Sequence, residues 1–332
     1  MAENGWSVYL TDNDSTDPVT STICTQINNI PVISTKYMFY RTEAISIDLN
    51  SFDTSNIIDM EGMFKYAHTP LLDLSNFNTS NVITMEKMFE ESEIKTLDIN
   101  NFDTSNVENF AAFLSRCKVI TIDLNYIKTN NATTMKEMFS SSKLKKIDLS
   151  HFNTSNVTNM SRMFNGSKST KIKGLDKFDT SNVTDMSYMF WDANVTNLDL
   201  SNFDTSNVIN MEWMFTSCRA KTINLLNFNT SKVTNMNWMF EGVYVVELDL
   251  SSFDTSNVTN MWRMFGSASN LVTIYASDKF VTDNVTDSTD MFIWTNNLVG
   301  GNGTKRTAAH SDKEYARIDT ADTPGYFTLK NN

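Results

Sequence analysis

The feature that most constrains this chain is an aromatic landmark, once replaced by isoleucine, that recurs every 25 residues. The interval is constant except for 26 residues between Phe152 and Phe178. The landmarks are Phe52, Phe77, Phe102, Ile127, Phe152, Phe178, Phe203, Phe228 and Phe253. Self-similarity at a fixed period is typical of a solenoid, in which each unit buries its apolar face only against its neighbours. We therefore expect stacked repeats that share one continuous core.

Each repeat reads roughly L-D-L-x-x-F-D-T-S-N-V-x-x-M-x-x-M-F, as in the copies that start at Leu72 and Leu248. The L-D-L segment alternates apolar and polar residues, which predicts a short strand with its leucines in the core and its aspartate outside. The second half has a helical spacing and predicts a two-turn helix. In the repeat at Phe253, the core face of that helix is Val258, Met261, Met264 and Phe265.

Polar residues flank the predicted helix in a way that fits its two ends. Asp254, Thr255 and Ser256 have short side chains that accept hydrogen bonds from free N–H groups at a helix N-terminus. Glycine or serine follows the Met-Phe pair, as in 165–167 and 266–267, and predicts a helix stop.

These elements predict an α/β fold: a right-handed solenoid of leucine-rich-repeat type with about nine repeats, each a short parallel strand plus a short helix. A helix needs about 8–10 Å beside its neighbour, whereas a strand needs only ~4.8 Å. A stack with strands on one side and helices on the other must curve. We therefore expect a horseshoe with the strands inside.

The recurring segment F-D-T-S-N-V-T-N-M-x-x-M-F resembles the repeat of the BspA-like leucine-rich-repeat surface proteins of bacteria and their phages, over about residues 46–292. The tail segments 298–304, 315–319 and 324–328 also resemble the part that closes many such arrays. The resemblance implies surface display and adhesion without enzymatic activity. This chain departs from cell-anchored members because it shows no signal peptide, sortase-type motif or anchoring helix, which favours presentation on a phage particle.

The array is expected to have distinct ends. Residues 1–44, which include Trp6, Tyr9, Pro18 and Pro31, are an N-terminal cap or an attachment region. Residues 45–292 form the repeat solenoid, and residues 293–332 form a C-terminal cap with a final strand at 326–329. The repeats at Ile127 and Phe178 are irregular, which is read as a tolerated defect or as a local bend.

Charge and composition exclude several classes of partner. The net charge is −12 and the pI is near 4.7, so the surface repels nucleic acid and anionic lipid. No run of 18 apolar residues is present, so no membrane insertion is expected. Cys24, Cys117 and Cys218 are expected to be free thiols, because the last two lie four periods apart, roughly 19 Å in a stack, beyond the ~7 Å limit for a bridge.

The outward strand position carries a ladder of aspartates: Asp48, Asp73, Asp98, Asp123, Asp148, Asp199 and Asp249, interrupted at Gly174 and Asn224. Carboxylates ~4.8 Å apart repel one another by about 0.9 kcal/mol even in bulk water. One interpretation is a concave acidic strip that binds cations or a basic partner. In the cation version, millimolar calcium would raise the melting temperature, and no shift would refute that version. The other is that each aspartate accepts nearby hydrogen bonds and fixes the register.

A second candidate site is an aromatic column. Tyr188, Trp213 and Trp238 precede the second methionine in three consecutive repeats, and Trp262 lies one place earlier in the next repeat. With methionine and phenylalanine inside, these rings are expected on the flank or the convex side of the predicted helices. They form either a platform for sugars or proteins or a cover over gaps between helices.

Catalytic and metal signatures are missing from the sequence. His68, His151 and His310 are widely separated, and no histidine or cysteine cluster has metal-ligand spacing. The segment 300–305 evokes a phosphate loop but lacks its spacing, so a turn is expected. No pair of aspartates is singled out for glycosidase chemistry. We therefore expect no catalytic residue, no enzyme activity and no cofactor other than calcium.

Two functions agree with this reading. The first is a binding or adhesion protein at a bacterial or phage surface, attached to a host-surface glycan or protein and possibly acting as the receptor-binding component of a phage. The second is a structural decoration or adaptor subunit whose partners are virion proteins. Both place the protein at an extracellular surface or on a virion.

Overall fold

The computed structural model describes residues 6–7, 16–17 and 25–330. The chain divides into two compact units. The first comprises residues 1–157 and 167–174, and the second comprises residues 158–166 and 175–332. Tyr9, Pro18 and Cys24, which the sequence analysis singled out, lie outside the described residues.

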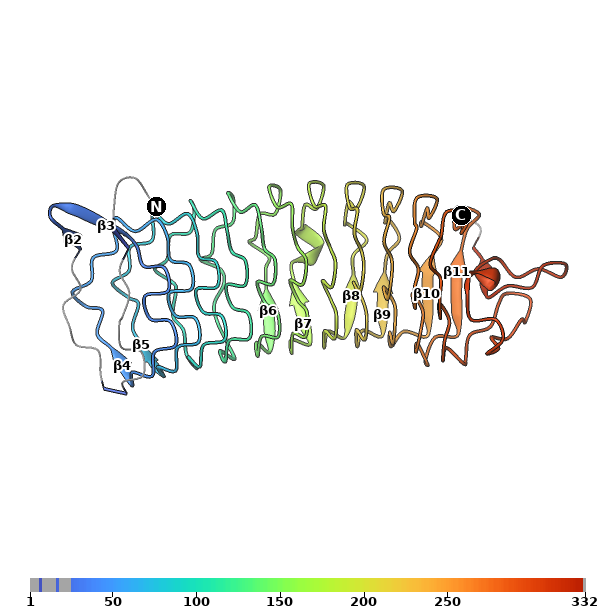
Figure 1. The fold of residues 1–332 in the computed structure, drawn as a ribbon, viewed down its shortest axis with the longest axis horizontal. Coiled ribbons are helices and arrows are strands. Elements are labelled where there is room, and N and C mark those ends of the chain that lie inside the picture. The colour runs from blue at the N-terminus through green and yellow to red at the C-terminus, as the bar shows by residue number, and fades with distance from the viewer. Residues whose placement is uncertain (1–5, 8–15, 18–24, 331–332) are drawn as a thin grey trace. The chain divides into compact units, whose positions relative to one another are not determined.

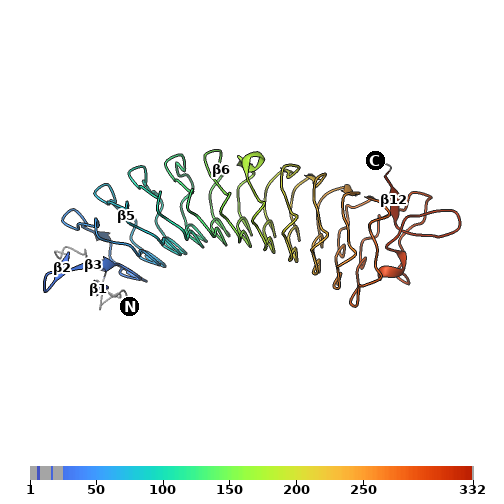
Figure 2. The same ribbon diagram turned by 90° about the horizontal axis from the view of Figure 1, so that it is seen from above.

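The first unit is a stack of parallel β coils, with strands β4 (Ser46–Ile47), β5 (Leu71–Leu72), β6 (Lys146–Asp148) and β7 (Lys171–Lys173) along one side (Figure 1). β4 pairs with β5 and β6 with β7, both in parallel. β1 (Trp6–Ser7), β2 (Gln26–Ile27) and β3 (Ile30–Ser34) form a small sheet at the N-terminal end (Figure 2), in which β2–β3 is antiparallel. Segments 96–99 and 121–124 carry no assigned strand, so the strand expected in every repeat is wrong for these two.

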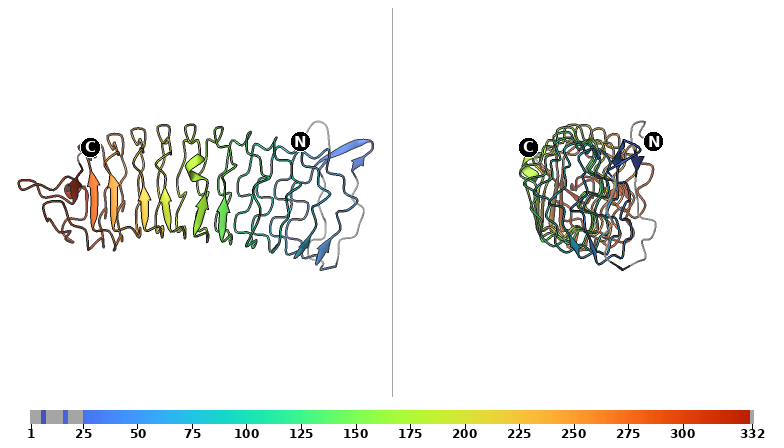
Figure 3. Two further views of the ribbon diagram at one scale, coloured as in Figure 1. Left: turned by 180° about the vertical axis from the view of Figure 1, so that it is seen from behind. Right: turned by 90° about the vertical axis from the view of Figure 1, so that its left-hand side faces the viewer.

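The second unit has the same construction. β8 (Asn197–Asp199) pairs with β9 (Thr222–Asn224), and β10 (Glu247–Leu250) pairs with β11 (Thr273–Ala276), all in parallel (Figure 3). β12 (Phe327–Leu329) adds to β11 in parallel, which confirms the strand predicted at 326–329. Two short 3-10 helices, η1 (Leu175–Lys177) and η2 (Lys313–Tyr315), are the helical elements among the described residues of the chain.

The predicted period is confirmed by a second ladder on the other side of each coil. Single parallel bridges join Ser34, Asp59, Thr84, Asn109 and Thr134 in the first unit. In the second unit they join Asn159, Asp185, Asn210, Asn235, Asn260 and Asp287, where the step of 26 residues falls between Asn159 and Asp185. Each unit is therefore a parallel β-solenoid whose coils follow the repeat.

The predicted core is confirmed. In the repeat at Phe253, both leucines of β10 and all of the predicted inward residues have no exposed surface. The phenylalanines of the Met-Phe pairs form stacks: Phe39, Phe64 and Phe89 in the first unit, and Phe164, Phe190, Phe215, Phe240, Phe265 and Phe292 in the second, with neighbouring ring centroids 5.4–5.8 Å apart. Because Phe39 stacks on Phe64 and Ser34 bridges Asp59, the stack already includes residues before 45.

The predicted helix in each repeat is wrong, and consecutive β-turns take its place. Met264 N–H bonds to the Met261 carbonyl at 3.1 Å, and Gly266 N–H bonds to the Arg263 carbonyl at 3.0 Å. Arg263 and Ser267 have φ of 51° and 55°, a left-handed conformation that an α-helix interior excludes. The leucine-rich-repeat detail of a strand plus a helix in each of nine repeats is therefore not reproduced. Because the described coils contain no such helix, unequal strand and helix widths no longer predict curvature.

Hydrogen bonds between coils explain why turns replace the helix. In the same segment, the N–H groups of Met261, Arg263, Phe265 and Ser267 donate to carbonyls of the following coil at 2.7–3.0 Å. Alternate N–H groups therefore bond within a turn and between coils, and the backbone is satisfied without helical pairing. The two turns place Met, Met and Phe inside, just as two helical turns would, so hydrophobic spacing cannot distinguish the two structures.

Candidate binding surfaces

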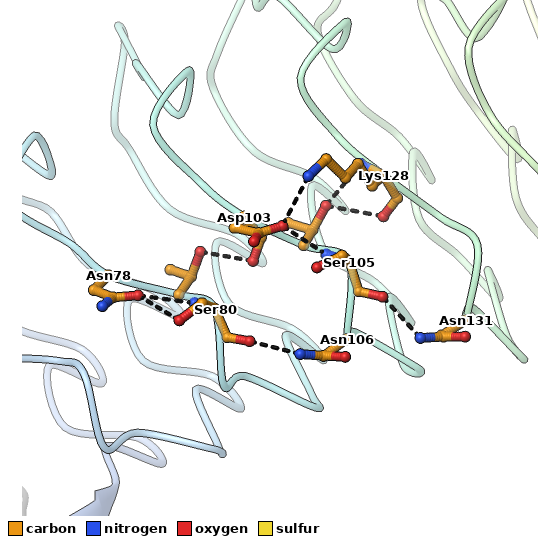
Figure 4. Close-up of polar contacts among 9 residues, drawn as sticks. Asn78, Ser80, Asp103, Ser105, Asn106, Lys128 and Asn131 are labelled. Carbon is orange, nitrogen blue, oxygen red and sulfur yellow. Dashed lines mark hydrogen bonds and ion pairs between the residues drawn. The ribbon is translucent and has the colours of Figure 1, made fainter.

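The F-D-T-S-N segment, predicted to cap a helix, builds polar ladders between coils instead (Figure 4). In the first unit, Asn78 Oδ1 accepts the Ser80 N–H at 3.1 Å, and Asp103 Oδ1 accepts the Ser105 N–H at 3.2 Å. Asn106 Nδ2 donates to the Ser80 carbonyl at 2.7 Å, one coil back. These contacts fix each turn and its register against the preceding coil.

The threonine of the same segment is buried and bridges two coils. Thr205 Oγ1 donates to the Asn229 carbonyl at 2.9 Å and accepts the Asn229 N–H at 2.8 Å. Thr230 makes the same two bonds with Asp254, at 2.8 and 2.9 Å. The residues that recur most faithfully in the repeat therefore have structural roles.

The members of the aspartate ladder point outward, as predicted, but only Asp148, Asp199 and Asp249 lie within strands. Every member accepts an N–H from two residues further on. The Oδ1···N distances are 2.9–3.2 Å for Asp48, Asp73, Asp98, Asp123, Asp148, Asp199 and Asp249. Hydrogen bonds from the Ser75 hydroxyl and N–H hold the pKa of Asp73 below its ordinary value, and those of Ser201 do so for Asp199. These bonds favour the charged carboxylates.

The two interruptions in the aspartate ladder, and a lysine of the C-terminal segment, supply partners for neighbouring carboxylates. Lys173, and not Gly174, occupies the aspartate position in its coil, and its Nζ lies 2.9 Å from Asp148 Oδ2. Asn224 Nδ2 donates to Asp199 Oδ1 at 2.9 Å, and Lys330 forms an ion pair with Asp249. Three or more metal-ligating side chains do not gather among the described residues, and calcium binding stays a prediction.

The aromatic column lies entirely in the second unit, and its rings pack against one another. Tyr188 stacks on Trp213 with centroids 5.5 Å apart, and Trp213 stacks on Trp238 at 4.3 Å. Trp262 meets Trp238 edge-on at 5.5 Å. All three stacked residues are half-buried and have left-handed φ of 57–59°. These rings were expected beside a helix. Because turns take the place of that helix, they lie at a left-handed turn position instead.

Arginine side chains flank the stacked rings. The Arg162 guanidinium carbon lies 4.3 Å from the Tyr188 centroid, and that of Arg263 lies 4.6 Å from the Trp238 centroid. Neighbouring rings and guanidinium groups therefore cover the faces of the stack, and its accessible surface is mainly ring edges. A platform for sugars or proteins on these three residues stays a prediction, and it would have to use the ring edges.

Two tryptophans that the sequence reasoning missed join the column. Trp191 packs edge-on against Tyr188 and Trp213, with both centroids at 5.7 Å. Trp294 lies 5.3 Å from the Arg263 guanidinium carbon and is 58% exposed, while Trp262 is 38% exposed. Trp294 occupies the second left-handed position of its turn, equivalent to Ser267 one coil earlier. The sequence signal that could have identified Trp294 is its position directly after the Met291-Phe292-Ile293 run.

Two of the three histidines and the predicted turn are held in structural contacts. His68 lies 3.6 Å from Glu43 and 3.7 Å from Glu93, and the His310 ring stacks on Tyr315 at 4.2 Å. The predicted turn at 300–305 is confirmed, and the N–H groups of Asn302 and Thr304 bind the carboxylate of Asp319.

Two thiols are described, and both are free and buried, as predicted for Cys117 and Cys218. Burial raises the pKa of Cys117 and raises the pKa of Cys218 to about 12. Both thiols are therefore in their protonated, unreactive form at neutral pH.

These features define a class: a parallel β-solenoid repeat protein whose recurring polar residues tie coil to coil. The family described as "Mycoplasma protein of unknown function, DUF285" matches residues 33–152, 133–225 and 220–301. The chain belongs to that family. No curated protein and no solved structure matches the chain. Within the described residues, none of the helices has the length and apolar character needed to cross a membrane.

Proposed function

We propose that the chain is a non-enzymatic binding protein, displayed at a bacterial or phage surface, that attaches to a glycan or protein of a host surface. The observation that carries this proposal is the aromatic column of the second unit, in which Trp262 and the added Trp294 are exposed. The resemblance of the chain to BspA-like surface proteins agrees with such a role. Within the family that the chain belongs to, we propose that its repeats are of the BspA-like type.

Exposed tryptophans support binding because a large apolar ring in water is unfavourable unless a partner covers it. Tryptophan also combines an apolar body with one N–H donor, which suits contacts with sugars and with protein partners. We assign the contact itself to Trp262 and Trp294, because they are the most exposed rings of the column. The stacked Tyr188, Trp213 and Trp238 form the rigid support beneath them.

A glycan array probed with the full chain tests this proposal. We expect saturable binding to a defined glycan, and we expect the double change Trp262→Ala and Trp294→Ala to abolish it while the melting temperature stays nearly constant. Tyr126→Ala removes a ring that is 51% exposed in the first unit and is the matched control. Binding that survives the double change would refute the assignment to these two rings.

A second function, a decoration or adaptor subunit, is favoured by a separate apolar patch of the second unit. Tyr244, Val246 and Val272 are all exposed, and the Val272 N–H bonds to the Val246 carbonyl at 2.8 Å, which places these two valines on adjacent coils. Such a patch fits a protein partner. An adaptor would bind no soluble glycan and would co-sediment with its particle, and Val246→Asp would abolish that association while leaving glycan binding unchanged.

A further inference from the structure

The first unit has a basic surface, although the chain as a whole is acidic. The chain carries 27 basic and 39 acidic residues. In the segment 118–173, however, exposed lysines recur on consecutive coils at Lys118, Lys143, Lys145, Lys146, Lys168 and Lys171. The period of the repeat turns this local excess of lysine into a continuous surface.

Backbone hydrogen bonds fix these lysines side by side. The Lys118 N–H bonds to the Ser92 carbonyl and the Lys168 N–H to the Ser142 carbonyl, both at 3.1 Å. Positions 93, 118, 143 and 168 therefore follow one another up the stack at the ~4.8 Å spacing of paired strands. Lys146 and Lys171 are direct partners in the β6–β7 pairing. Like charges at this spacing repel, and a bound anion would relieve the repulsion.

Part of this surface is an open groove of about 560 Å³, lined by Glu93, Lys95, Lys118, Ile120, Lys143 and Lys145. It contains four lysines and a single carboxylate, Glu93, whose Oε1 lies 3.9 Å from Lys118 Nζ. Ile120 is 47% exposed between the lysines, and the Lys145 N–H bonds to its carbonyl at 3.2 Å. The groove therefore combines positive charge with one apolar contact.

We propose that this groove binds a linear anionic polysaccharide that carries carboxylate, sulfate or phosphate groups. A polymer fits because lysines repeat from coil to coil and can meet successive anionic groups of one chain. A polysaccharide fits better than nucleic acid, because no aromatic side chain lines the groove to stack on a base. The exposed Ile120 contacts the C–H face of a sugar ring. This site does not depend on the aromatic column.

The test is a titration of the full chain with fluorescent dextran sulfate, polygalacturonate and neutral dextran, followed by anisotropy at low and moderate salt. We expect binding to a charged polymer, weakening with salt, and no binding to neutral dextran. The triple change Lys118→Gln, Lys143→Gln and Lys145→Gln should lower the affinity at least about tenfold, and Lys→Arg at the same positions should retain it.

The matched control replaces three exposed lysines of the second unit, Lys177, Lys279 and Lys305, by glutamine, which changes the net charge equally. Equal losses of affinity in the two triple variants would show a general charge effect and would refute the groove as the binding site. Equal binding of neutral dextran, or tighter binding of single-stranded DNA than of either charged polymer, would overturn the assignment to an anionic polysaccharide. Because these outcomes do not involve the tryptophans, they are separate from failure of the proposed adhesion function.

Discussion

Replacing one buried threonine by valine tests the central structural conclusion, that the T-S-N segment joins coils and does not cap helices. Thr205 has no exposed surface, and its hydroxyl both donates to and accepts from the backbone of Asn229. Thr205→Val keeps the shape of the side chain and removes both hydrogen bonds. A helix-capping threonine would instead be exposed and would serve a donor of its own repeat.

The magnitude follows from the two bonds. Each neutral hydrogen bond contributes about 1 kcal/mol net, and leaving the Asn229 N–H and carbonyl unpaired adds about 1 kcal/mol, since water reaches this residue in part. We expect a loss of about 2–3 kcal/mol in the free energy of unfolding. For 332 residues that unfold together, this corresponds to a fall of roughly 3–4 °C in melting temperature.

Urea unfolding followed by circular dichroism measures the loss, and hydrogen exchange at the Asn229 amide locates it. Thr205→Ser is the matched control, because it keeps the hydroxyl and loses only a methyl group. Valine should therefore destabilise more than serine and should speed exchange at Asn229. If valine equals the wild type, or if serine is the more harmful change, the bridging role is wrong.

Three further predictions follow from backbone geometry and ionisation. Gly174→Ala should lower stability by more than about 2 kcal/mol in urea titration, because φ is 92° and the new Cβ would lie 2.5 Å from the Ser150 nitrogen; an unchanged midpoint would contradict this. Ser217→Gly should raise stability by about 0.5 kcal/mol in the same assay, since φ of 53° strains serine by more than glycine loses in entropy. Burial alone would raise the pKa of Asp319, but hydrogen bonds from Thr304, Gly325 and Asn302 lower it below its ordinary value. Its stabilising contribution is therefore present above about pH 4 and lost as pH falls through the lower folded pKa, so melting curves of Asp319→Asn should depend less on acid pH than those of the wild type.

The candidate surfaces were predictable to different degrees. The aspartate ladder and the column of Tyr188, Trp213 and Trp238 follow from position in the repeat, because residues one period apart must become neighbours in a stack. The groups that cover the ring faces could not be predicted from the sequence. Ring stacking and the placement of Arg162 and Arg263 depend on the left-handed turn. The lysine groove was hidden for another reason: the net charge averages over the chain, whereas the stack gathers its lysines on one surface.

The sequence by itself determined that the chain is a solenoid, where its period slips by one residue, and which side chains enter the core. Periodicity contains that information, because identical positions in successive coils must pack on one another. Only the tertiary structure decided what each coil is made of. Two helical turns and two consecutive β-turns bury the same Met-x-x-Met-Phe pattern, and the difference lies in whether alternate N–H groups bond within the repeat or to the next coil. Those bonds exist only once the coils are stacked.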